Sequence, residues 1–438
     1  KLGVIYEKGQ GVKQSQADSQ HRLGLMYGKG EGVKQDFVKA REWYLKAASQ
    51  GDADSQHALG LMYDNGEGVK QDFVKAREWY LKAAAQGHAD SQDSLGCMYH
   101  NGQGVNIDYE KARGWFQTPA SQGHAESQYY LGVIYGKGQG VKQDYIKAGK
   151  LYYKAACQGH MISQYNLGVM FNRGQGMKKN IVKAIEWLLK ASSQGYAEAQ
   201  YYVGAIYATE GLNQDLMKAR EFYLKAADQG NQDAQCCLGV MYYTGEGMDK
   251  KQDFHKAYEW YYKAAVQGHI ASQFALGSMA ELGEGISNNK EDNDEAYKWY
   301  RKAAEQGHAD SQSKIGIMYY EGISVKKNPK IALKWILKAV NQGHAFSQYV
   351  LGLLHEKGDE VEQDYIKARD LYIKAATQGT VDAQYSLGSM YHQGEGGMKQ
   401  DKIKAREWYL QAATKGHTRA QHALARMMVD EAQETGEH

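Results

Sequence analysis

The sequence is poor in proline and cysteine and has no long hydrophobic run. Only 2 prolines and 4 cysteines occur among its 438 residues. Cys97, Cys157, Cys236 and Cys237 form no C-x-x-C motif and follow no period, which argues against a disulfide framework or a zinc site. No apolar segment approaches the roughly 20 residues that a membrane-spanning helix needs. The few cysteines and the absence of an N-x-S/T sequon favour a reducing compartment such as the cytoplasm.

The chain also lacks an excess of charge of either sign. Its 53 basic and 51 acidic residues give a formal net charge of +2. A nucleic-acid-binding surface normally shows a strong basic excess, so the balance argues against a nucleic-acid partner. No segment has the alternating pattern of a β-strand, and the sequence therefore predicts an all-α protein.

A Gln-Gly pair recurs through the chain at a nearly constant distance. Successive pairs are 36 residues apart four times, then 35, 38, 39, 36 and 36, and a Lys415-Gly416 copy follows after 37. A fixed period in this range is typical of a solenoid, in which each unit packs only against its neighbours. We therefore expect one repeat array in place of the few globular domains that the length alone suggests.

Residues 53–87 represent the unit, and two amphipathic helices fit inside it. Gln56 and Leu59 share one face of the first helix, and Trp79 lies on the apolar face of the second. Asp72 precedes the second helix at the N-cap position, where a carboxylate accepts backbone hydrogen bonds. An aspartate or asparagine recurs here in every repeat: Asp36, Asp72, Asp108, Asp144, Asn180, Asp215, Asp253, Asp292, Asn328, Asp364 and Asp401.

Two further positions of the aligned repeats, here called columns, indicate packing. All eight tryptophans share one column, which we interpret as a core position and not as a binding site. A glycine inside the first helix, Gly60 in the unit, recurs although it costs about 1 kcal/mol relative to alanine. We expect the Trp/Tyr pair of a neighbouring helix to approach it closely. The tryptophans are Trp43, Trp79, Trp115, Trp187, Trp260, Trp299, Trp335 and Trp408.

The two prolines differ in their predicted effect. Pro119 falls inside a second helix, where the missing N–H should kink or shorten the helix. Pro329 directly follows Asn328 at the first helical position, where proline is favourable.

The ends of the chain depart from the pattern. A whole second helix is missing between Gln14 and Ser15, so the N-terminus should be irregular. Because the chain begins at Lys1 within a unit and without methionine, we expect a fragment, and a preceding signal peptide or domain stays open. The predicted division is a truncated repeat at 1–16, eleven helix pairs at 17–416, a capping helix at 417–431 and a polar tail at 432–438.

The repeated pattern A-x-S/A-Q-x-x-L-G-x-x-Y-x-x-G-x-G-V-x-x-D-x-x-K-A-x-x-W-Y-x-K-A-A-x-Q-G-H closely resembles the Sel-one-like repeat, a relative of the tetratricopeptide repeat. The resemblance covers nearly the whole chain. It implies a right-handed α/α superhelical solenoid with the first helices on the concave side. It also implies an adaptor, since members of the family hold partners in membrane-protein quality control, chitin-synthase activation, bacterial signalling and host interaction.

The sequence offers little that suggests catalysis or a cofactor. Seven histidines sit one per repeat after the Gln-Gly pair, too far apart to share a metal ion, and we interpret them as turn residues at helix starts. The G-x-G loops follow helices and not the strand that a nucleotide-binding loop requires. No pair of nucleophile and base stands out, so we expect no enzymatic activity, cofactor or metal. The histidines are His88, His124, His160, His269, His308, His344 and His417.

The candidate for binding is the column one residue after the repeated glutamine of the first helix, here called the aromatic column. Six of its members are aromatic, and aromatic side chains are frequent anchors at protein interfaces. The alternative is that these rings pack between adjacent first helices. The six predicted partner-binding residues are Tyr129, Tyr165, Tyr201, Phe274, Tyr349 and Tyr385; the others are His21, His57, Asp93, Cys236, Ser313 and His422.

These observations favour a non-enzymatic scaffold that binds a protein or peptide along the groove of the solenoid. One alternative is the regulatory array of a larger signalling enzyme whose catalytic domain lies outside this chain. Another is a hydrolase within the array, which would require converging acid, base and nucleophile side chains.

Overall fold

The computed structural model describes residues 13–209, 214–247, 252–285 and 291–435, and within these residues the chain is helical and contains no strand. It divides into two units, Lys1–Asn213 and Gln214–His438. The predicted all-α solenoid of two-helix repeats is confirmed. The irregular segment predicted before residue 17 lies mostly outside the described residues.

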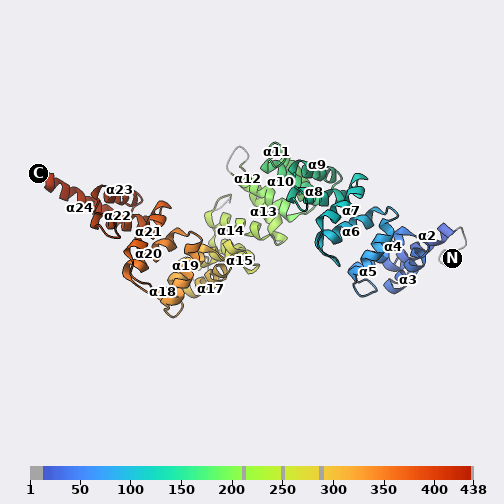
Figure 1. Cartoon of the computed structure of the whole chain (residues 1–438), viewed down its shortest axis with the longest axis horizontal. Coiled ribbons are helices and arrows are strands. Elements are labelled where there is room, and N and C mark those ends of the chain that lie inside the picture. Colours follow the sequence, from blue (N-terminus) through green and yellow to red (C-terminus); the bar gives the residue numbers. More distant parts are fainter. Residues whose placement is uncertain (1–12, 210–213, 248–251, 286–290, 436–438) are drawn as a thin grey trace. The chain divides into compact units, whose positions relative to one another are not determined.

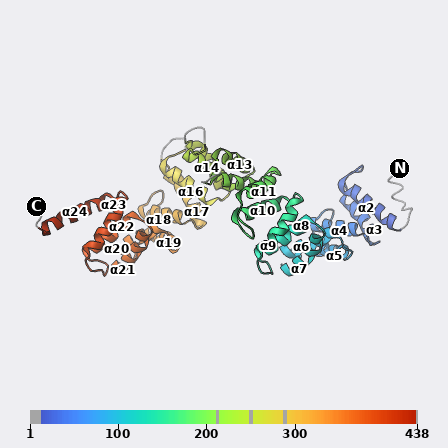
Figure 2. The same ribbon diagram turned by 90° about the horizontal axis from the view of Figure 1, so that it is seen from above.

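The described residues of unit 1 form five helix pairs and one further first helix, and consecutive helices pack against each other (Figures 1 and 2). Even-numbered helices are the first helices of the repeats, and odd-numbered helices are the second. The helices are α2 (Lys13–Lys29), α3 (Phe37–Ala48), α4 (Ala53–Asn65), α5 (Phe73–Ala84), α6 (Ala89–Asn101), α7 (Tyr109–Ser121), α8 (Ala125–Lys137), α9 (Tyr145–Cys157), α10 (Met161–Arg173), α11 (Ile181–Ser193) and α12 (Ala197–Ala208).

The described residues of unit 2 form a second helix, then five helix pairs and then α24. That last helix continues past residue 431, where the sequence pattern predicted its end, to Thr435. The helices are α13 (Leu216–Asp228), α14 (Gln232–Thr244), α15 (Phe254–Val266), α16 (Ile270–Leu282), α17 (Asn293–Glu305), α18 (Ala309–Glu321), α19 (Pro329–Asn341), α20 (Ala345–Lys357), α21 (Tyr365–Thr377), α22 (Val381–Gln393), α23 (Lys402–Thr414) and α24 (Thr418–Thr435).

The second helices begin at the predicted N-caps. Asp72 has an extended backbone with φ of −152°, and its carboxylate accepts hydrogen bonds from the N–H groups of Val74 and Lys75, both at 3.1 Å. These N–H groups have no partner within the helix, so the cap satisfies them. All eleven predicted caps accept such a bond, and this prediction is confirmed.

The first helices end in a G-x-G loop, and its second glycine lies close to the preceding repeat. Gly68 has φ of +66°, and a Cβ there would lie 2.7 Å from Cβ of Phe37, the first residue of α3. Two repeats have Ser324 and Glu360 at this column, with φ of 56° and 58°. In both cases the preceding repeat has no aromatic residue at the position equivalent to Phe37. That residue is Asn293 for Ser324 and Pro329 for Glu360.

The glycine inside the first helix makes room for the second helix of the same repeat. A Cβ on Gly60 would lie 2.4 Å from Cε1 of Tyr80, and Gly24 and Gly132 meet a tyrosine ring in the same way. The predicted close approach is confirmed, with one refinement. The tyrosine that follows the tryptophan enters the space, and the tryptophan does not.

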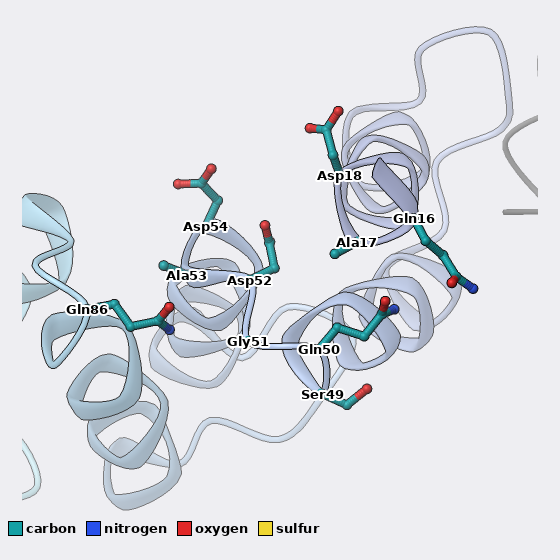
Figure 3. A pocket seen from close by; sticks show the side chains of 10 residues that line it. All are labelled: Gln16, Ala17, Asp18, Ser49, Gln50, Gly51, Asp52, Ala53, Asp54 and Gln86. Atoms are coloured by element: carbon teal, nitrogen blue, oxygen red, sulfur yellow. The ribbon is translucent and has the colours of Figure 1, made fainter. Parts of the chain in front are cut away.

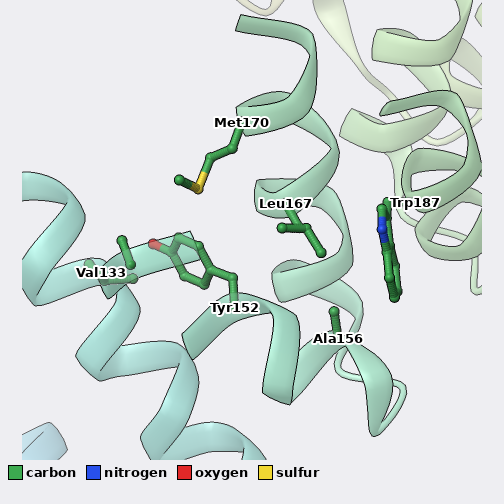
Figure 4. Close-up of a cluster of buried hydrophobic side chains, with 7 residues drawn as sticks. Val133, Tyr152, Ala156, Leu167, Met170 and Trp187 are labelled. Atoms are coloured by element: carbon green, nitrogen blue, oxygen red, sulfur yellow. The ribbon is translucent and has the colours of Figure 1, made fainter. Parts of the chain in front are cut away.

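The tryptophans complete the core between successive repeats. In unit 1, Trp187 is 8% exposed and belongs to a cluster with Tyr152 and Ala156 of α9 and Leu167 of α10. Figure 4 shows Tyr152 pointing toward Val133 and Trp187 on the other side of Leu167. Because α9 belongs to the preceding repeat, the tryptophan joins its own repeat to that one. The prediction that the tryptophans pack is confirmed, since all eight are buried or half-buried.

The repeated glutamine of the first helix links three segments through one amide group. Nε2 of Gln56 donates to the carbonyl of Ala48 in the preceding repeat at 3.3 Å. Its Oε1 accepts from Nε2 of Gln86, which follows α5, at 2.9 Å. We call this arrangement the glutamine link. Gln56 is 6% exposed, so both bonds satisfy polar atoms that have little access to water.

Pro119 does not shorten its helix. Helix α7 continues through Pro119 to Ser121, and the carbonyl of Pro119 accepts a hydrogen bond from the N–H of His124 at 2.9 Å. The proline lies in the last turn, where fewer intrahelical bonds depend on it. In the glutamine link of this repeat, Gln122 would donate to Oε1 of Gln92. This oxygen is instead buried with no partner among the described residues. Pro329 begins α19 after the Asn328 cap, as predicted.

Candidate binding surface on the first helices

The aromatic column lies half-buried on the first helices. Tyr129 of α8 contacts Tyr152 of its own repeat and His160 of the next, with ring centroids 6.2 and 4.9 Å away. Phe274 of α16 contacts Tyr300 and His308 similarly, at 5.7 and 4.9 Å. These rings therefore pack in part against the next repeat, as the alternative prediction expects. Each of these side chains also keeps some exposed surface, because each residue is only partly buried.

The predicted residues are distributed over both units. Tyr129, Tyr165 and Tyr201 lie on consecutive first helices of unit 1, where Tyr165 also contacts Tyr202 of α12 at 6.0 Å. Burial raises the pKa of Tyr165 to about 12, so its hydroxyl remains a hydrogen-bond donor at neutral pH. Phe274, Tyr349 and Tyr385 form the corresponding set in unit 2 and are also half-buried.

Where a histidine follows the Gln-Gly pair, it lies at the start of the next first helix, and in most cases it also contacts an acid of the preceding repeat. Nδ1 of His88 accepts the backbone N–H of Ser91 at 3.1 Å, and Nε2 lies 3.1 Å from Oδ1 of Asp54 on α4. A backbone N–H can only donate, so Nδ1 is the accepting nitrogen of this ring. We call this pair the acid–histidine bridge. It occurs in His88–Asp54, His124–Asp90, His160–Glu126, His269–Asp233, His344–Asp310 and His417–Asp382.

At two junctions both partners of the bridge are replaced together, whereas three others keep only one, since Asp18 is followed by Asp52, Glu198 by Asn231 and Ala271 by His308. Where the acid is replaced by Ile162, the next repeat has Tyr196 in place of histidine, and Tyr165 packs on it at 5.3 Å. Where the acid is replaced by Phe346, the histidine is replaced by Thr380. The bridge is therefore a contact between repeats and not a feature of one repeat.

The bridge resembles a chain of nucleophile, base and acid, but its serine is inaccessible. The hydroxyl of Ser91 lies 3.1 Å from Nδ1 of His88, which in turn contacts Asp54. Ser91 is 0% exposed, and Nδ1 of His88 already accepts its backbone N–H. A buried hydroxyl cannot reach a substrate, so the arrangement stabilises the junction and does not form a hydrolase site.

A hollow opens on this surface between α2, α3 and α4. It has a volume of about 390 Å³, and Leu25, Leu61 and Met62 contribute apolar groups to it. His21 and His57 of the aromatic column also line it. Leu61 is 39% exposed, whereas Val133 at the same column of α8 is 8% exposed and packs in the cluster that Tyr129 adjoins. The hollow thus lies where the aromatic column holds histidine.

Carboxylates surround this part of unit 1. Asp54 and Asp90 line the hollow, and their side chains are 68% and 61% exposed. Asp54 also lines a neighbouring polar depression of about 1120 Å³, together with Asp18 and Asp52. Figure 3 shows the carboxylates of Asp18, Asp52 and Asp54 pointing to the same side of α2 and α4. The two cavities therefore share an acidic edge.

Other polar groups near this surface are engaged in structural contacts. The hydroxyl of Tyr80 donates to Asp64 at 3.2 Å, and burial raises the pKa of Asp64. Burial also raises the pKa of Cys97 to about 12, so this thiol is protonated at neutral pH. No three His, Cys, Asp or Glu side chains of the described chain are placed to hold a metal ion.

In the part of the chain that the structure describes, no helix is both long enough and apolar enough to cross a membrane.

The comparison with protein families gives one match that repeats along the chain. The Sel1 repeat model matches residues 1–17, 17–52, 53–88, 89–124, 125–160, 162–196, 197–231, 232–269, 270–308, 309–344, 345–380 and 381–417. The chain belongs to the Sel1 repeat family. From residue 53 onward the matched segments begin at the starts of the first helices or one residue later, so each of these Sel1 repeats is one helix pair.

Solved structures of Sel1 repeat proteins are similar to this chain. A protective antigen of uropathogenic Escherichia coli with an SLR fold has 34% sequence identity and a TM-score of 0.80, over 98% of this chain and 90% of that one. A Sel1 repeat protein from Oxalobacter formigenes has 28% identity and a TM-score of 0.39, over 84% of this chain and 93% of that one. None of the curated proteins compared with the chain matches it.

Sequence reasoning located the aromatic column but missed the acid–histidine bridge and the hollow. A signal for the bridge is present in the aligned Sel1 repeats, because the acid and the next histidine are lost together at Ile162 and Tyr196. The signal for the hollow is weaker. It consists of two histidines, His21 and His57, at a position where other repeats have tyrosine. Whether such a histidine leaves space beside Leu61 depends on how the neighbouring helices pack.

Proposed function

We propose that this Sel1 repeat chain is a scaffold that binds a protein or peptide segment along its first helices. Repeat solenoids generally present such extended binding surfaces. The observation that carries the proposal is the row of half-buried aromatic rings, one per repeat, of which Tyr129 and Tyr165 are adjacent members.

The packing of these rings suits them to act as anchors. Tyr129 is held by Tyr152 and His160 and is only partly buried. A ring that is already ordered loses little conformational freedom when a partner covers it. Aromatic side chains in such positions are frequent hot spots of protein interfaces. A series of weak anchors on successive repeats then adds up to useful affinity through avidity.

The proposal is tested by replacing two adjacent anchors, Tyr129→Ser with Tyr165→Ser. Serine occupies this column naturally at Ser313, so the fold should tolerate it. We expect capture of partner proteins to fall about tenfold or more, as for the loss of hot-spot residues, with a nearly unchanged melting temperature. Quantitative mass spectrometry of material bound to each immobilised variant, with circular dichroism melting, provides the measurement.

The matched control is Tyr153→Ser on α9, where the tyrosine is 53% exposed but does not belong to the aromatic column. This variant should capture the same partners as the unmodified chain. Equal capture by all variants would contradict the proposal. Collapse of the fold in the double variant would show that the column is core.

A further inference from the structure

The hollow of unit 1 differs from the rest of the aromatic column in shape. In α8 the column residue Tyr129 packs against the cluster that contains Val133, which is only 8% exposed. In α4 the column residue is His57, and Leu61 at the column of Val133 is exposed beside about 390 Å³ of free volume. Pockets of this size with apolar walls commonly accept a ligand side chain.

The edges of the hollow carry mainly negative charge. Asp54, Glu67 and Asp90 line it, against a single cation, Lys29. The imidazole of His57 adds no charge at neutral pH, because burial and the nearby His88 lower its pKa to about 4. The negative edge continues into the adjoining depression, where Asp18, Asp52 and Asp54 lie together.

We propose that this hollow is the docking site for a basic and apolar segment of a partner protein. One apolar or aromatic side chain enters the space beside Leu61, and flanking lysine or arginine side chains pair with Asp54 and Asp90. This inference rests on the proposed scaffold function and adds the location of one binding position and the chemistry of its occupant.

The acidic edge also has a structural role, which does not remove its capacity to bind. Asp54 contacts His88 through Oδ1, and Asp90 contacts His124 through Oδ1. Each carboxylate has a second oxygen, and both side chains are more than half exposed. A carboxylate accepts several hydrogen bonds, so an incoming guanidinium or ammonium group can pair with it while the bridge remains.

The geometry of the repeats sets the expected spacing of the basic residues. Asp54 and Asp90 occupy equivalent positions on the adjacent first helices α4 and α6. Packed helices lie about 8–10 Å apart, and an extended chain advances about 3.3 Å per residue. Basic residues about three positions apart would therefore face successive carboxylates, with the apolar side chain between them.

The test uses a phage library of random peptides of about twelve residues, which extend over about 40 Å. The library is selected on the immobilised full chain and, in parallel, on the His57→Tyr variant. Tyrosine is the commonest residue of this column, so the substitution should fill the hollow and keep the fold. We expect enriched peptides that combine Lys or Arg with Leu, Phe or Trp, and at least about a tenfold loss of affinity for His57→Tyr.

A second variant keeps the test decisive if His57→Tyr alters folding. Asp54→Asn with Asp90→Asn should weaken binding of the enriched peptides about fivefold and reduce its salt dependence, since these are exposed charge pairs. The matched control is Asp310→Asn with Asp382→Asn in unit 2, which changes the same two bridge positions away from the hollow. The control should bind the peptides as the unmodified chain does.

Each other result would overturn part of the inference. Enriched peptides that bind His57→Tyr equally well would show that the hollow is not the site, while leaving the scaffold function intact. Acidic or neutral peptides that lose affinity for His57→Tyr would contradict the predicted chemistry of the occupant. Enrichment no greater than on a surface without the protein would contradict the inference, whereas unchanged partner capture by the Tyr129→Ser and Tyr165→Ser chain would contradict the scaffold function.

Discussion

At the scale of single residues, a buried amide joins neighbouring repeats. Gln56 donates to Ala48 of the preceding repeat and accepts from Gln86 at the end of its own. Leucine has a similar volume but forms neither bond, and a buried polar group without a partner costs about 1–3 kcal/mol. The repeated glutamine is therefore a structural residue, although it is polar.

We predict that Gln56→Leu lowers the free energy of unfolding by about 1–3 kcal/mol, because it removes both hydrogen bonds of the glutamine link, each of which contributes about 0.5–1.5 kcal/mol. Equilibrium unfolding in urea, followed by circular dichroism, measures the change.

Gln92→Leu provides the matched comparison, because Oε1 of Gln92 already lacks a partner. It retains only the bond from Nε2 to the carbonyl of Ala84, at 3.3 Å. We expect this variant to lose about 1 kcal/mol less than Gln56→Leu. Equal losses at both positions would show that the glutamine link contributes nothing to stability.

At the scale of the helix pair, glycine sets how closely the two helices approach. A Cβ at Gly60 would lie 2.4 Å from Tyr80, a distance at which one of the two helices must move. Alanine would gain about 1 kcal/mol of helix propensity, whereas overpacking typically costs about 1–3 kcal/mol. The steric cost therefore exceeds the gain.

Gly60→Ala should consequently destabilise the chain by up to about 2 kcal/mol, in spite of alanine's better helix propensity. Gly114 of α7 is the matched control, because a Cβ there would meet nothing within 4 Å. Gly114→Ala should stabilise the chain by about 0.5–1 kcal/mol. Thermal melting of both variants tests the prediction, which fails if the two changes have the same sign.

Much of the helix pair could be predicted from the sequence, because its determinants are local. Asp72 lies directly before the helix that it caps, and Gly60 recurs at a position where only close packing explains it. The requirement for Gly68 was not predictable in this way, since it depends on Phe37 in another repeat. The shortening predicted at Pro119 was wrong, because a proline in the last turn disturbs few hydrogen bonds.

At the scale of the whole molecule, stability should vary along the array. Each repeat contacts only its neighbours, so a local defect weakens its own surroundings first. In unit 1 such a defect lies at α7, where Pro119 offers no N–H to the carbonyl of Trp115. In the adjacent helix α6, Gln92 lacks a complete glutamine link.

We predict that amide hydrogens of α7 exchange faster than those of α5, and that Pro119→Ala raises the local free energy of opening by about 1 kcal/mol. Hydrogen exchange followed by mass spectrometry resolves the two helices. The control is Pro329→Ala at the first position of α19, where the N–H is not needed and no gain is expected. Equal protection of α5 and α7 would contradict the prediction.

The candidate binding surface could be predicted only in outline. The period located the aromatic column, including Tyr129 and Tyr165, because every member has the same place in its repeat. The hollow beside Leu61 could not be predicted, because it depends on three helices and on His57 lying where other repeats have tyrosine. A repeated sequence predicts what its repeats share more readily than where one of them differs.

The acid–histidine bridge has a consequence for how such a gene can change in length. An in-frame loss of residues 88–123, which are 36 residues, would place His124 opposite Asp54 and restore an acid–histidine pair. Loss of residues 160–195 would instead place Tyr196 opposite Glu126, an aromatic ring against a carboxylate. Recombination can therefore remove a repeat and keep the bridge where successive junctions are alike, whereas at the junction of Ile162 and Tyr196 the same change alters the contact between repeats.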